Sequence, residues 1–88
     1  MSSFHQRIVT PEELIYEGEA ERIIVRTVQG EVAILPRHID YLAALGTGEA
    51  RITAVNGEVK KAHIEGGLLH VASNDVQIIS HHFEWTEA

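Results

Sequence analysis

Alternation of apolar and polar residues is the clearest pattern in this chain. In the segment ARITAVNGEVKKAHIE, apolar residues alternate with polar ones before Asn56-Gly57 and again at Ala62 and Ile64 after it. On the first side Ala50, Ile52 and Ala54 share one face. Asn and Gly both tolerate positive φ, as the two central residues of a type I′ turn require. The segment therefore predicts a hairpin of two half-buried strands.

Turn-forming residues recur at short intervals along the whole chain, for example at Thr10-Pro11, Gln29-Gly30 and Gly66-Gly67. Runs rich in Ile, Val and Leu lie between them, a spacing typical of sandwiches and barrels. We predict an all-β fold, an antiparallel β-sandwich of about 8–10 short strands. Alternation predicts that its core contains Ile23, Val25, Ile34, Ile52, Ile64, Leu69, Val71 and Ile78.

One segment departs from the strand pattern. Between Ile39 and Leu45 the apolar residues Ile39, Leu42 and Leu45 are three apart, which is a helical spacing. We expect a single helical turn or an irregular loop there.

Length and charge narrow the classes of partner. The 88 residues fit one domain, 1–88, without cysteine for disulfide or thiol chemistry. The formal net charge is −6 and the seven basic residues are scattered, so nucleic acid and anionic lipid are poor direct partners. No apolar run approaches the roughly 20 residues that a membrane span needs, so we expect no lipid insertion.

Catalytic and metal-binding patterns are weak. His81 and His82 are adjacent in an expected strand and face opposite sides. His63 and His70 flank Gly66-Gly67 and are candidates for cross-strand neighbours, but the chain has no cysteine and no H-x-x-x-H helical ligand spacing. We therefore expect no bound metal and no cofactor. No Ser, His and Asp set resembles a nucleophile elbow, and Gly66-Gly67 is expected to be a tight turn because no Lys-Ser/Thr follows. An interaction module and a small-ligand binder remain as the open alternatives.

Three segments, taken in order, resemble one known family. They are IVTPEELIYEGE, GEVAILPRHIDYLAAL and GGLLHVASNDVQII. The chain resembles the N-terminal β-sandwich domain of the epsilon subunit of rotary F-type ATP synthases, over its whole length and without large gaps. The family pattern has a glycine where Ala33 stands and a proline where Asp40 stands. Proline would have fixed the φ angle of that loop.

The resemblance implies a non-catalytic subunit of the central rotor, at the cytoplasmic face of the inner membrane. Its partners would be the gamma subunit and the c-ring, coupling ion flow to ATP synthesis. It implies a c-ring contact at Gln29, Gly30, Glu31 and Val32. It implies a gamma contact at Thr10, His38, Ile39, Asp40, Tyr41, Leu42 and Ala43. The strand from Ala33 to Leu35 would then be core, with a contact surface at each end.

Members of this family usually continue into a helical hairpin, which carries their inhibitory and ATP-sensing functions. Its Ile/Leu-Asp-x-x-Arg-Ala opening does not occur in these 88 residues. The ending FEWTEA lies near the family's domain junction, which favours an excised domain, whereas the initial Met1 fits a naturally short subunit.

Overall fold

The alternating segments form seven β-strands. The computed structural model describes residues 3–37 and 39–86. The strands are β1 (Phe4–Val9), β2 (Leu14–Thr27), β3 (Gly30–Ile34), β4 (Tyr41–Ala44), β5 (Thr47–Ala54), β6 (Val59–Ala72) and β7 (Asp75–Trp85). They number fewer than the eight to ten expected, because β2 and β6 continue through glycines that resemble turns in the sequence.

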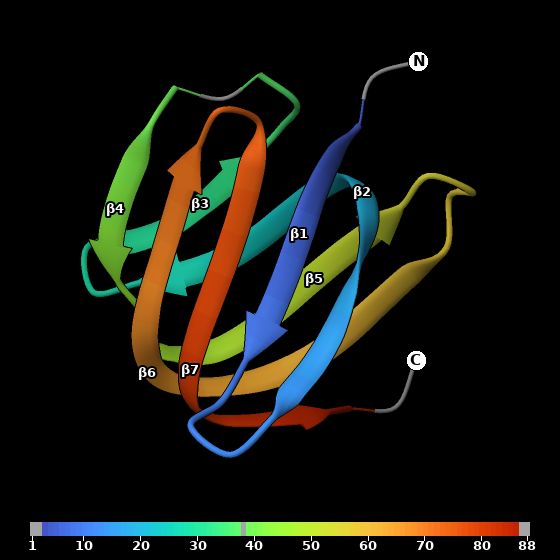
Figure 1. Cartoon of the computed structure of the whole chain (residues 1–88). Helices are drawn as coiled ribbons and strands as arrows, with labels where there is room; N and C mark the ends of the chain where they lie inside the picture. The colour runs from blue at the N-terminus through green and yellow to red at the C-terminus, as the bar shows by residue number, and fades with distance from the viewer. Residues whose placement is uncertain (1–2, 38, 87–88) are drawn as a thin grey trace.

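The strands lie in two packed layers, as Figure 1 shows. The front layer contains β4, the second half of β6, the first half of β7, β1 and the start of β2. The back layer contains β3, the end of β2, β5 and the first half of β6. Because β2 and β6 run through both layers, all seven strands share one hydrogen-bonded network. The predicted all-β sandwich is confirmed.

One pairing is not antiparallel. Strands β1 and β7 run parallel, with His5 opposite Asp75 and Val9 opposite Ile79. Local patterns predict antiparallel neighbours because short turns join consecutive strands. The partners β1 and β7 lie at opposite ends of the chain, so no turn between them sets their direction.

Glycines bend β6 where it passes from one layer to the other. Gly66 and Gly67 have φ angles of 71° and 122° inside the strand, so the expected tight turn is wrong. A Cβ built on Gly67 would overlap the carbonyl oxygen of Ile79 and lie 2.8 Å from the Cα of Ser80. Only glycine allows this close approach of two backbones.

The core lies between the layers and follows the alternation. All eight side chains expected in the core are at most 3% exposed, and Phe4, Ile8 and Val76 join them. The β3 strand is only partly core, since Ile34 is buried whereas Ala33 and Leu35 are exposed. The Ala33–Leu35 expectation is thus wrong at two of three positions.

Two local expectations also need correction. Residues 41–44 form strand β4 instead of a helical turn, because they pair with residues 68–71 of β6. In the β5–β6 hairpin only Gly57 has positive φ (89°), and its N–H donates to the Ala54 carbonyl at 2.9 Å. The loop is therefore three residues long, a turn followed by a left-handed glycine, and not type I′.

Candidate functional site

The outer face of the front layer carries a row of apolar side chains. Strand register places one residue from each strand side by side across the layer, and their sequence neighbours Leu69, Ile78 and Ile8 point into the core. We call this the front apolar row: Leu14, Val9, Ile79, Leu68 and Ala44. Leu14, Leu68 and Ile79 are 50%, 44% and 38% exposed. Contiguous exposed apolar side chains of this kind mark contact surfaces.

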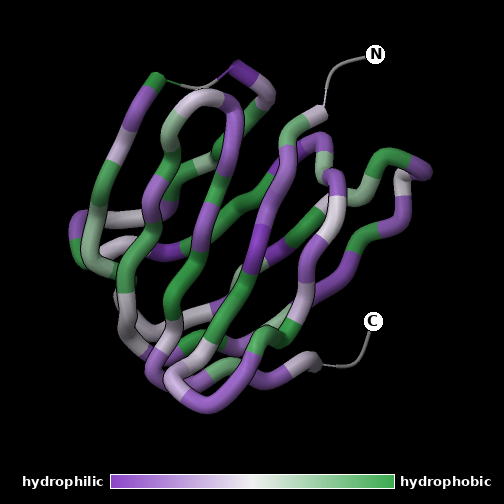
Figure 2. The backbone as a smooth tube through the Cα atoms, viewed as in Figure 1, coloured by the Kyte–Doolittle hydropathy of each residue, from purple (hydrophilic) through white to green (hydrophobic). Residues whose placement is uncertain are grey.

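A shallow hollow of about 320 Å³ lies on this row. Pro11, Leu68 and Ile79 line it, together with Gly67, Ser80 and His81. Figure 2 shows apolar segments in several strands of the front layer. An apolar side chain of a partner protein could pack into this hollow against the apolar row.

The residues expected at the gamma contact fall at the two ends of the front apolar row. Thr10 follows Val9 at one end, in a turn where its N–H and carbonyl both bond Glu13. At the other end Ala43 precedes Ala44 in β4, and Leu42 is 66% exposed in the next row.

The other residues expected at the gamma contact do not all lie on the surface. Ile39 and Asp40 lie in the exposed β3–β4 loop, whereas Tyr41 is half-buried and packs against the core. His38 lies outside the described residues. The structure therefore brings Thr10 and Leu42 onto one face but gives Tyr41 a mainly structural position.

The residues expected at the c-ring contact lie on the β2–β3 turn. Thr27 organises this turn: its Oγ1 donates to the Gly30 carbonyl at 2.7 Å and accepts from the Gln29 N–H at 3.1 Å. Gln29 and Glu31 are exposed, and Gly30 has a φ of 127°. Val32 instead packs against the core.

The turn lies directly beside β4. The Val28 N–H donates to the Ala44 carbonyl at 3.0 Å, and Thr27 forms a bridge with Leu45. Residues 27–29 and residues 41–44 together line a hollow of about 240 Å³. The expected ring contact and one end of the expected gamma contact are thus neighbours on the molecule, as the left side of Figure 1 shows.

Sequence reasoning did not anticipate several exposed residues of these surfaces. Val28 is 67% exposed at the turn, and Leu68 and Ile79 form the centre of the front apolar row. A sequence signal existed, since Leu68-Leu69 and Ile78-Ile79 are consecutive apolar pairs within strands. Consecutive strand residues face opposite sides, so one member of each pair has to point outward.

The outer face of the back layer is charged. The Arg51 guanidinium lies 3.8 Å from the carboxylates of both Glu31 and Glu49. His63 pairs across the strands with Glu49 and Glu84. Alternating charges of this kind suit a solvated face, so the two faces of the sandwich differ in character.

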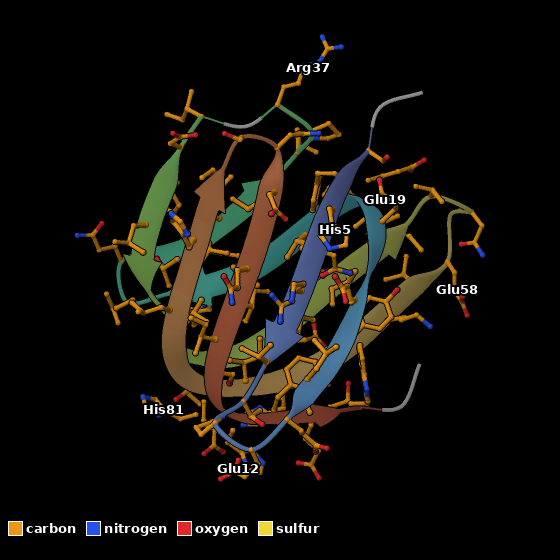
Figure 3. The ribbon with its side chains drawn as sticks, in the orientation of Figure 1. His5, Glu12, Glu19, Arg37, Glu58 and His81 are labelled. Carbon is orange, nitrogen blue, oxygen red and sulfur yellow. The ribbon has the colours of Figure 1, made fainter. Side chains whose placement is uncertain are left out.

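Histidines and carboxylates do not gather into a metal centre. His63 and His70 both belong to β6 and do not face each other across strands, contrary to the suggested pairing. His5 Nε2 lies 2.7 Å from Glu17, and its Nδ1 lies 3.6 Å from Glu19; Figure 3 shows His5 and Glu19 close together. Within residues 3–37 and 39–86, no three His, Asp or Glu side chains are grouped to hold a metal ion.

A third hollow bears on the small-ligand alternative. It has a volume of about 340 Å³, and its lining consists of Tyr16, residues 58–61, Trp85 and Thr86. Trp85 is 42% exposed, and it packs edge-on against Tyr16 with 5.6 Å between ring centroids. Tyr16 and Lys60 are half-buried, but the other lining residues are exposed and the hollow is open, whereas small-molecule sites bury most of the ligand surface.

Residues 3–37 and 39–86 hold no helix with the length and apolar character needed to cross a bilayer.

Known proteins resemble this chain in sequence. Epsilon chains of ATP synthase are 38% identical over 80 residues in Alkalihalophilus pseudofirmus and 42% identical over 79 residues in Thioalkalivibrio sulfidiphilus. These matches cover 91% and 89% of this chain, but only 59% and 56% of the relatives. The chain thus spans well under two thirds of the length of these relatives.

Solved structures share the fold. A chain in the mitochondrial ATP synthase of Euglena gracilis superimposes with a TM-score of 0.91 at 22% identity, covering 97% of this chain and 54% of that one. A chain of the Tetrahymena thermophila mitochondrial ATP synthase central stalk gives 0.74 at 22% identity, covering 90% and 63%. The sequence model of one protein family, the β-sandwich domain of the ATP synthase delta/epsilon chain, matches residues 3–86. With that match over nearly its whole length, this chain belongs to the ATP synthase delta/epsilon β-sandwich family.

Proposed function

We propose that this chain is a non-catalytic domain of the rotor of an F-type ATP synthase, joining the gamma subunit to the c-ring. Family membership supports the assignment, and the front apolar row is the observation that carries it. A rotor domain of this kind needs two docking surfaces on one rigid body. The apolar front face and the adjoining β2–β3 turn meet that need.

The front apolar row is the proposed gamma surface. Leu68 and Ile79 at its centre are flanked by Thr10 at one end and by Ala43 with the exposed Leu42 at the other. Interface cores are apolar and depleted in charge, which fits the row. At the β1–β2 side the surface is charged, with Glu17 and Glu19 around His5 and the exposed Arg7 opposite Glu17. A complementary gamma surface would carry apolar side chains next to charged ones.

The β2–β3 turn is the proposed c-ring surface. It presents Gln29 and Glu31 together with the exposed Val28. Polar turn residues around one exposed valine suit the polar loops of a membrane-embedded ring. The chain would then lie peripherally, on the cytoplasmic face of the inner membrane, without entering lipid. In this role it would couple ion movement to ATP synthesis without performing the chemistry itself.

The gamma surface is tested by Leu68→Asp and Ile79→Asp in a binding assay with separately expressed gamma subunit. Burying an unpaired carboxylate in an apolar contact should weaken binding at least about tenfold. Val59→Asp is the matched control, because Val59 is 41% exposed but lies in the β5–β6 hairpin. Equal binding by all three variants and the unmodified chain would remove the front face from consideration.

The ring surface is tested by Glu31→Lys, measured as ATP-driven ion pumping by the assembled enzyme. Glu49→Lys is the control, because Glu49 also lies 3.8 Å from Arg51 but belongs to β5, away from the turn. Each surface pair contributes only about 0–1 kcal/mol, so both variants should fold. Glu31→Lys should impair pumping and Glu49→Lys should not; the same pumping rate in both would contradict the assigned contact.

A further inference from the structure

The side chain of Asn74 holds three separate parts of the chain together. Asn74 lies in the β6–β7 turn, and its Oδ1 accepts the Arg37 N–H at 2.7 Å. Its Nδ2 donates to the Ser3 carbonyl at 2.9 Å. One amide thus joins the β3–β4 loop to the start of the chain before β1. Its two partners, Arg37 and Ser3, lie 37 and 71 residues from Asn74 in the sequence.

The turn is shaped to present that amide. Ser73 and Asn74 have φ angles of 54° and 62°, in the left-handed region, where Asn is the most tolerant residue after Gly. Arg37, whose N–H donates this hydrogen bond, has a φ of 64°. A non-glycine residue keeps such a conformation when its surroundings hold it there. The bond from the Arg37 N–H to Asn74 is a direct cause of that kind.

A second hydrogen bond acts on the same loop. The Ser73 N–H donates to Oδ1 of Asp40 at 3.3 Å. Asp40 stands where the family pattern has a proline, which would restrict the loop through its fixed φ. In this chain the loop instead makes two hydrogen bonds with the Ser73-Asn74 turn. The Arg37 N–H donates to the Asn74 side chain, and the Asp40 side chain accepts from the Ser73 N–H.

We propose that Asn74 is a positioning residue for the gamma contact: it holds the β3–β4 loop in the conformation that binds. The inference rests on the proposed function and on the expectation that Ile39 and Asp40 of this loop belong to the gamma contact beside Leu42. Only the Arg37 backbone is held, while its side chain extends away from the sandwich, as Figure 3 shows. Ile39 is 77% exposed on the same loop. Arg37 and Ile39 thus present exposed side chains close to a backbone position, the Arg37 N–H, that Asn74 holds.

The experiment compares Asn74→Ala with Asn56→Ala in the 88-residue chain. Asn56 is the matched control, since its Oδ1 accepts the Glu58 N–H at 2.9 Å in a different exposed turn. Two quantities are measured for each variant: the Kd for separately expressed gamma subunit, and the hydrogen exchange of the Arg37 amide by NMR. Asn74→Asp is added because it keeps the oxygen that accepts from Arg37 and loses the Nδ2 donor.

Asn74→Ala should raise the Kd about five- to tenfold, because the binding-competent loop becomes a minor population. The Arg37 amide should exchange faster, and Asn74→Asp should restore much of its protection and of the affinity. Asn56→Ala should change neither quantity.

Three results would overturn the inference: faster Arg37 exchange with an unchanged Kd, unchanged Arg37 exchange, or equal weakening by Asn56→Ala. A failure of the unmodified chain to bind gamma would overturn the proposed function as well. That failure is distinguishable because it does not depend on any variant.

Discussion

Gly67 is the residue whose replacement should cost most. Gly67→Ala would force a Cβ into the backbone of Ile79 and Ser80 at a φ of 122°. Strain and overpacking should together lower the free energy of unfolding by about 3 kcal/mol or more. Gly57→Ala separates the two causes, because Gly57 has a φ of 89° but nothing within 4 Å of its Cβ position. That variant should lose only about 1 kcal/mol; urea denaturation measures both, and equal losses would contradict the steric argument.

Gln6 is an unusual core residue. Its side chain is fully buried, and neither its Oε1 nor its Nε2 has a hydrogen-bond partner among the described residues. An unpaired buried amide costs about 1–3 kcal/mol, so Gln6→Met, which keeps the length of the side chain, should raise stability by about 1 kcal/mol. Gln6→Ala is the contrasting variant and should lower stability by leaving a cavity. A lower melting temperature for Gln6→Met would show that the amide is satisfied in solution.

At the scale of single elements, the β2–β3 turn depends on one hydroxyl. The buried Thr27 Oγ1 both donates to Gly30 and accepts from Gln29. Thr27→Val keeps the shape of the side chain but removes both bonds, and should cost about 1–2 kcal/mol. Thr53→Val, on the half-buried part of β5, should stay within about 0.5 kcal/mol of the unmodified chain. Chemical denaturation distinguishes the two, and similar values would mean that the turn does not need the hydroxyl.

Sequence patterns predicted the elements where packing follows local alternation. Ile52 and Ile64 each have polar residues on both sides, so their burial could be inferred without knowing the partner strands. Strand β4 could not be found this way. Its outward residue Leu42 is apolar because it lies on the front face, and this hides the alternation.

Glycine signals have two meanings that sequence alone does not separate. Both a tight turn and a bent strand need positive φ, and Gly66-Gly67 belongs to the second class because β4 and β7 pair with β6 beyond it. The candidate surfaces show the same limit. The resemblance indicated Thr10 and Leu42, but the row that connects them depends on cross-strand register, which no local pattern contains.

At the scale of the whole molecule, dimensions limit what these residues can do. The principal extents are 31 × 28 × 24 Å. In the ATP synthase epsilon family that the sequence resembles, inhibition and ATP sensing belong to a helical hairpin that reaches toward the catalytic head. A sandwich of these dimensions is too short to span that distance by itself. A polypeptide of these 88 residues should therefore restore ATP-driven pumping to an enzyme lacking its epsilon subunit, with little inhibition of ATP hydrolysis and no ATP binding. Both rates are measured on the same preparation, and strong inhibition by the sandwich alone would sink the prediction.

The parallel pairing of β1 with β7 has a consequence for synthesis. Residues 5–9 find their partners at residues 75–79, so β1 has only one of its two neighbours while most of the chain is still being made. A ribosome adds residues one at a time, and the front layer cannot close until β7 has emerged. The nascent chain would therefore expose an unpaired β1 edge and its apolar residues until residues 75–79 have been made. Chaperone contacts during that interval should concentrate on the first strand.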